Sequence, residues 1–201
     1  MDQKGVTGDH FQKLLDTGVL ADLFDPKADF SNREAFRAAL KLGTAASKPS
    51  VLKLVNGDVA LDAIAAYDPS ALKSRKGVWV SDDFVLHVRL RASPVENLGQ
   101  LSLSSHELMK NTYEREITPG LGENYIFYES ELCARIDQMI SKQPNGEKGD
   151  LLTNNGHANI FYVAGYVVHV RWLSDYRKWD VDRWDLGDDR WRAGDRVFAR
   201  N

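Results

Sequence analysis

The stretch NIFYVAGYVVHVRWL, residues 159–173, contains two apolar segments separated by an Ala-Gly pair. Its residues are mainly β-branched and aromatic, and these types favour strands. In the second segment Tyr166, Val168, Val170 and Trp172 alternate with the residues that would form the other face. This pattern predicts a tight antiparallel hairpin with the glycine in its turn.

Short segments on both sides of this hairpin extend the predicted sheet. Residues 179–184 and 196–200 follow it as strands, and residues 125–128 precede it. Residues 84–91 alternate between apolar and polar side chains, which predicts a half-buried antiparallel strand. Val78–Val80 is expected to pair with this strand across a Ser-Asp-Asp turn.

Four segments are predicted to be helical. Two of them show apolar residues at helical spacing. The other two begin at Ser31 and Ser104 with a capping box, in which the serine and a glutamate three positions later bond each other's backbone amides. Residues 50–67 fit either strand or helix. The predicted helices are residues 9–24, 32–42, 104–116 and 130–142.

These elements predict an α+β fold with a mainly antiparallel sheet of about five to seven strands. The order of elements lacks the βαβα alternation that a parallel sheet requires. Residues 1–44 form a predicted helical segment, and residues 45–201 form a predicted α+β domain that holds the sheet and two further helices. The two parts are either separate domains or one structural unit.

Composition limits the classes of function. The 201 residues carry a net charge of −3, so a generally basic surface for nucleic acid is absent. The single cysteine, Cys133, excludes an internal disulfide and a Cys-x-x-Cys metal site. The polar beginning of the chain and the lack of a long apolar run favour a cytoplasmic protein without a membrane partner. Neither a metal nor another cofactor is expected.

A repeated His-x-Arg pattern is the first candidate site. It occurs in residues 85–90 and again in residues 167–172. If the two segments are neighbouring strands, one sheet face could bind phosphate or carboxylate through forked arginine donors and titratable histidines. The alternative, which we favour, is that these are ordinary solvent-facing positions. The candidate residues are His87, Arg89, Arg91, His169 and Arg171.

The C-terminal tail is the second candidate site. Residues 172–201 hold four of the five tryptophans, with arginines and seven aspartates between them. Such a segment could bind a protein partner or stack on the bases of a single-stranded nucleic acid. The aspartates disfavour nucleic acid, and packing of the indoles within the sheet is the structural alternative that we favour. The candidates for binding are Trp179, Trp184 and Trp191.

Familiar catalytic patterns do not occur in the sequence. Walker A, G-x-G-x-x-G and G-x-S-x-G motifs are absent, and the histidines lack metal-site spacing. Cys133 lies among apolar residues of a predicted helix, as a small core residue would. Whether the protein is an enzyme is therefore open.

The segments Lys41–Thr44 and Asp189–Arg200, with the central strands and helix, resemble a group of small uncharacterised bacterial proteins. The resemblance implies a single structural unit and no particular activity. The leading hypothesis is a non-enzymatic interaction or regulatory protein that binds a protein partner or itself. The alternatives are an enzyme that acts on a phosphate- or carboxylate-bearing substrate and a protein that binds single-stranded nucleic acid.

Overall fold

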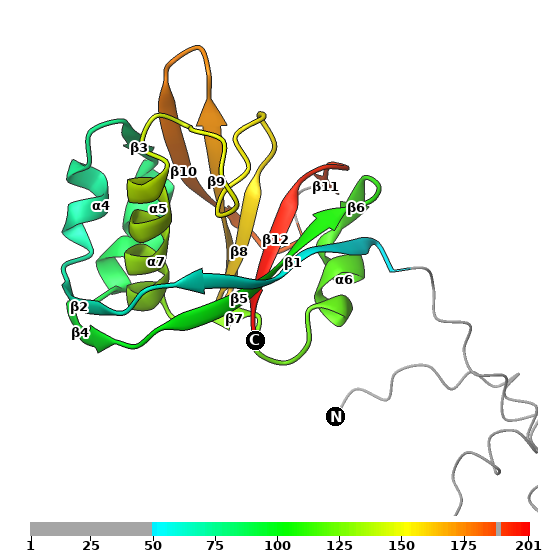
Figure 1. Cartoon of the computed structure of the whole chain (residues 1–201), viewed down its shortest axis with the longest axis horizontal. Coiled ribbons are helices and arrows are strands. Elements are labelled where there is room, and N and C mark those ends of the chain that lie inside the picture. Colours follow the sequence, from blue (N-terminus) through cyan, green and yellow to red (C-terminus); the bar gives the residue numbers. More distant parts are fainter. Residues whose placement is uncertain (1–49, 188–189) are drawn as a thin grey trace, which may run out of the picture. The chain divides into compact units, whose positions relative to one another are not determined.

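The structure is a computed structural model that describes residues 50–187 and 190–201. The predicted helices 9–24 and 32–42, and with them the segment 1–44, lie outside the described residues. Strands are the most frequent regular structure in the described part (Figure 1). In chain order the elements are β1 (Leu52–Leu61), β2 (Ile64–Tyr67), α4 (Ser70–Ser74), β3 (Val78–Val80), α5 (Asp82–His87), the 3-10 helix η1 (Arg89–Arg91), β4 (Val95–Leu98), β5 (Leu101–Leu108), β6 (Thr112–Tyr113), α6 (Glu114–Ile117), the 3-10 helix η2 (Thr118–Gly120), β7 (Ile126–Phe127), α7 (Glu129–Lys142), β8 (Asn159–Val163), β9 (Tyr166–Leu173), β10 (Lys178–Asp185), β11 (Arg190–Trp191) and β12 (Arg196–Arg200).

One eight-stranded sheet organises the described residues. Its order is β1-β5-β12-β8-β9-β10-β3, and β7 also pairs with β8. The pairs β1–β5, β5–β12, β8–β9 and β9–β10 are antiparallel, whereas β12–β8, β7–β8 and β10–β3 are parallel. The predicted α+β class with a mainly antiparallel sheet is confirmed, whereas the sheet has eight strands and not the five to seven that were expected.

The hairpin predicted from residues 159–173 is present as β8 and β9. Asn159 is opposite Val170, and Val163 is opposite Tyr166. Gly165 in the turn has a φ of +86°, a conformation that a residue with a Cβ adopts only with strain. The glycine therefore fixes the register of the two strands.

Two hydrophobic clusters cover the two faces of the sheet. On one side, which we call the α7 face, Phe161, Val168 and Val170 pack with α7, α5 and α4. On the other side, the α6 face, Ile160 and Val167 pack with α6 and its neighbours. Figure 1 shows α4, α5 and α7 together, away from α6. Each β9 side chain therefore faces one cluster or the other, as alternation requires.

The prediction of a strand over residues 84–91 is wrong, because this segment forms α5 and η1. The Ser81 hydroxyl accepts a 3.0 Å hydrogen bond from the Phe84 amide, and so caps the helix. Phe84 and Val88 are buried four positions apart, a spacing that also suits a helix. The pairing expected for β3 is wrong too, because β3 pairs with β10.

The helix predicted over residues 104–116 is also wrong. Residues 101–108 form β5, and only Glu114–Ile117 is α-helical. The Ser104 hydroxyl bonds the Ala199 carbonyl at 3.4 Å instead of capping a helix. Pairing with β1 on one side and β12 on the other outweighs the local capping signal. Residues 50–67, which fitted either type, form β1 and β2.

The remaining helix and strand predictions that fall within the described residues agree with the structure. Helix α7 coincides with the predicted helix 130–142 to within one residue. Its buried positions, among them Leu132, Ile136 and Met139, follow helical spacing against the α7 face. Strands β3, β7, β10 and β12 lie where short strands were expected.

Candidate functional site

The predicted surface shared by the two His-x-Arg segments does not form. His87 belongs to α5, and its ring lies 5.5 Å from the ring of Tyr166, centroid to centroid. Tyr166 shares the α7 side of β9 with Val168, whereas His169 is on the α6 side. The two histidines therefore lie on opposite faces of the sheet. This placement removes the geometric basis for a phosphate or carboxylate site that contains both.

The cations near His87 gather around Tyr166. The guanidinium carbon of Arg91 is 5.5 Å from the Tyr166 ring centroid, and that of Arg183 is 4.3 Å from it. Arg89 lies elsewhere, in a shallow recess of about 200 Å³ that Asp68 also lines. Cation–π packing thus accounts for Arg91 without a ligand.

On the α6 side, three polar residues of β9 and β10 form a cluster. Arg171 is directly opposite Asp180, and its Nη2 is 3.5 Å from the Asp180 carboxylate. The His169 Nε2 is 3.8 Å from the same carboxylate. His169 is 2% exposed, with its ring centroid 4.4 Å from that of Trp184. A substrate cannot reach this imidazole, so the cluster has a structural role, with Arg171 as its accessible member.

The tail tryptophans mostly pack within the domain. Trp179 is fully buried on the α7 face, and its Nε1 donates a 2.7 Å hydrogen bond to the Gln143 carbonyl. Trp191 is 4% exposed and stacks on Trp184 with 5.1 Å between centroids. Packing of the indoles within the sheet, the alternative favoured from the sequence, therefore describes these residues. The hypothesis that they form an exposed binding surface loses its main support.

The exposed tryptophan is Trp79, which the sequence analysis did not single out. It is 57% exposed on β3, the last strand of the sheet on that side. Val78 and Val80 pack on the α7 face, so Trp79 points to the α6 side, in register with Asp180. The sequence does carry a signal for this placement. Trp79 stands between two valines, and alternation along a strand places it on the face opposite to theirs. We call Trp79, Arg171 and Asp180 together the hairpin face.

The loop that joins β9 to β10, residues 174–177, is the hairpin tip. In Figure 1 the hairpin extends beyond the neighbouring strands, so that its tip stands clear of the sheet. Tyr176 at the tip is 73% exposed. Arg177 has a φ of +50°, and its amide bonds the Ser174 carbonyl at 3.2 Å to close the turn. The tip therefore presents an aromatic ring, a cation and the exposed Asp175 carboxylate on a tight turn.

Replacing Arg177 with glycine is expected to stabilise the protein. A residue with a Cβ at positive φ carries strain of about 1 kcal/mol or more, and the added backbone freedom of glycine in the unfolded chain offsets part of the relief. We expect a net gain of about 0.5 kcal/mol in the free energy of unfolding. The measurement is urea denaturation followed by circular dichroism. The control is Lys178→Gly, in the adjoining strand, which should lower the free energy of unfolding. If both variants were more stable than the unmodified protein, or if neither were, the strain assigned to Arg177 would be contradicted.

Comparisons of the chain with known protein families, with curated proteins and with solved structures find no match. Nor, within residues 50–187 and 190–201, does any group of three or more His, Cys, Asp or Glu residues come close enough to hold a metal ion. The same residues include no helix that is long and apolar enough to cross a membrane. The assignment of function therefore depends on the surface itself.

The Cys133 thiol is not suited to nucleophilic chemistry. It is fully buried in α7, and burial raises its pKa to about 12. The thiol is therefore protonated near neutral pH, and the reactive form is the thiolate. The location of Cys133 in the core agrees with its interpretation as a small packing residue.

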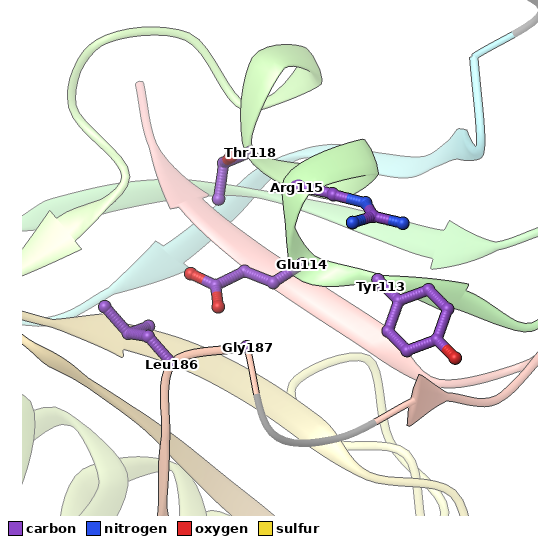
Figure 2. A pocket seen from close by; sticks show the side chains of 6 residues that line it. All are labelled: Tyr113, Glu114, Arg115, Thr118, Leu186 and Gly187. Atoms are coloured by element: carbon purple, nitrogen blue, oxygen red, sulfur yellow. The ribbon is translucent and has the colours of Figure 1, made fainter.

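A second surface feature is a recess of about 280 Å³ beside α6 (Figure 2). Burial raises the pKa of the Glu114 carboxyl, while a hydrogen bond from the Gly187 amide opposes the shift. The guanidinium carbon of Arg115 is 5.4 Å from the Tyr113 ring centroid, and that of Arg190 is 6.0 Å from it. The recess thus combines a carboxylate with a cationic, aromatic rim. Its walls are Tyr113, Glu114, Arg115, Thr118, Leu186 and Gly187.

Proposed function

We propose that the protein is a non-enzymatic interaction protein that binds an acidic surface of another protein through the hairpin face and the hairpin tip. The observation that carries the proposal is the exposure of two aromatics, Trp79 at 57% on β3 and Tyr176 at 73% at the tip of the adjoining β9–β10 hairpin. Tryptophan, tyrosine and arginine are the residues that dominate the binding energy of protein interfaces. Exposed large aromatics have an unfavourable contact with water that a partner would relieve.

Charge supports an acidic partner. Within the described residues, neither Arg177 nor Lys178 has an ion-pair partner within 4.0 Å, whereas Arg171 is held by Asp180. A partner with carboxylates beside an apolar recess would pair with these cations and cover the aromatic rings. Self-association through a two-fold axis at the tip would bring Arg177 and Lys178 close to their own copies, which disfavours a second copy as the occupant. The expected cytoplasmic location belongs to the same proposal.

The test begins by identifying the partner and ends with its purified form. A photo-crosslinking residue at position 176 captures the partner in cells, and one at position 128 is the control, because Tyr128 is also 73% exposed but precedes α7. Affinity is then measured by calorimetry with purified proteins. We expect Trp79→Ala and Tyr176→Ala each to weaken binding by about 10- to 100-fold, as at interface hot spots, without changing thermal stability.

The controls separate this proposal from its alternatives. Tyr128→Ala should leave affinity unchanged, and the effect of Arg177→Glu should shrink as salt rises. An equal loss in the Tyr128 variant would overturn the proposed surface. Salt-sensitive binding of an oligothymidylate that Trp79→Ala and Tyr176→Ala abolish would replace the protein partner with single-stranded nucleic acid.

A further inference from the structure

The recess beside α6 carries an inference that does not depend on the proposed function. We propose that it binds a small zwitterion, a free α-amino acid or a molecule with the same paired ammonium and carboxylate groups. The Glu114 carboxylate would bind the ammonium group, and the Arg115 guanidinium would bind the carboxylate. Nothing in this assignment involves the hairpin face.

The argument starts from where the two charges lie. Figure 2 shows the Glu114 carboxylate directed toward Leu186, and the Arg115 guanidinium directed toward Tyr113, on the other side of the recess. Consecutive residues thus place opposite charges at opposite ends of one concavity. A ligand with a single charge would satisfy one end only, whereas a zwitterion satisfies both.

Both charged groups are available to a ligand. Within the described residues, neither Glu114 nor Arg115 has an ion-pair partner within 4.0 Å, while the neighbouring Glu116 pairs with Lys110 at 3.2 Å. The burial that raises the Glu114 pKa also withholds water from the carboxylate. An ammonium group would replace the missing solvation of the carboxylate. The ion pair between the two groups would be stronger in this half-buried site than in water.

Size and surroundings select a small ligand. The volume of about 280 Å³ is just below the range of about 300–1,000 Å³ that holds drug-sized molecules. Leu186 and the Tyr113 ring offer apolar contact for a short side chain, and Thr118 also lines the recess. The recess opens to solvent, so we expect a dissociation constant of about 1 mM.

The experiment is a titration of the full-length ¹⁵N-labelled protein with glycine, L-serine and L-leucine, followed by NMR chemical shifts. We expect saturable shifts at residues 113–118 and 186–187. Acetate and methylammonium, which carry one charge each, should bind at least about 10-fold more weakly than the amino acids. Glu114→Gln and Arg115→Gln should each weaken amino-acid binding by about 5-fold or more.

The matched controls are Glu123→Gln and Arg192→Gln, two exposed charges outside the lining. These variants should bind as the unmodified protein does. Shifts confined to other residues, a linear response up to about 50 mM, or equal binding of acetate would each overturn the proposal. An unchanged amide spectrum of Glu114→Gln and of Arg115→Gln in the absence of ligand verifies that these variants are folded.

Discussion

Replacing Trp179 with alanine is expected to lower the free energy of unfolding by about 3–5 kcal/mol. The indole is fully buried among the residues of the α7 face. Its Nε1 donates to the Gln143 carbonyl at 2.7 Å, and its ring meets that of Trp172 edge-on, with 5.4 Å between centroids. Truncation leaves a cavity and removes one of the two hydrogen bonds that the Gln143 carbonyl accepts, the other coming from the Gly146 amide at 3.1 Å. Both losses destabilise the folded state.

The measurement is urea or thermal denaturation of the full-length chain, with a fall in melting temperature of about 10 °C expected. Trp79→Ala is the matched control, because it removes the same side chain from a site that is 57% exposed. We expect it to change stability by less than about 0.5 kcal/mol. Trp179→Phe keeps most of the volume and loses the hydrogen bond, so its cost should lie between the two. Equal costs for Trp79→Ala and Trp179→Ala would refute the burial assigned to these indoles.

The contrast between these two tryptophans shows what a sequence pattern cannot predict about burial. Alternation places Trp79 and its neighbours on opposite faces of a strand, but it does not say which face is covered. Trp179 is buried because α7 and the Gln143 carbonyl lie over it. Trp79 is exposed because β3 ends the sheet and nothing in the described residues covers its α6 side. Both facts depend on contacts between distant segments.

Local sequence patterns were sufficient to predict an element where its apolar residues follow a single helix or strand period. The hairpin of β8 and β9 and the helix α7 were predicted correctly, because each combines a strong period with suitable ends. Residues 84–91 carry two periods at once: Phe84 and Val88 suit a helix as well as a strand. The cap at Ser81 decides between them. The strand interpretation required Leu86 to point inward, and it is 59% exposed.

The predicted His/Arg site failed for the same reason. Its symmetry required two similar strands, and one of the two segments is helical. Arg171 keeps an accessible position, but on a different surface from His87. Residues 104–108 show the converse problem, because their capping signal is overruled by pairing with β12, roughly ninety positions away in the chain.

A second large effect is expected from Asp195→Ala, which should cost about 2–4 kcal/mol of stability. Asp195 is 4% exposed, in the turn that leads into β12. Its carboxylate accepts hydrogen bonds from the Ala158 amide at 3.0 Å and the Arg192 amide at 2.8 Å. The His157 Nδ1 is a further 3.3 Å neighbour. Alanine would leave two amides without an acceptor, at the point where β8 and β12 begin to pair.

The partial substitution Asp195→Asn separates the hydrogen bonds from the packing. The amide retains one acceptor oxygen and introduces a donor that faces a backbone amide, so we expect a cost of about 1–2 kcal/mol, below that of alanine. Asp175→Ala, at the exposed hairpin tip, is the control and should change stability by less than about 0.5 kcal/mol. Hydrogen exchange measured by NMR adds a local readout, because loss of the carboxylate should expose the Ala158 and Arg192 amides first. If Asp195→Ala were as stable as the Asp175 variant, with those amides still protected, the turn would be held by its backbone hydrogen bonds alone.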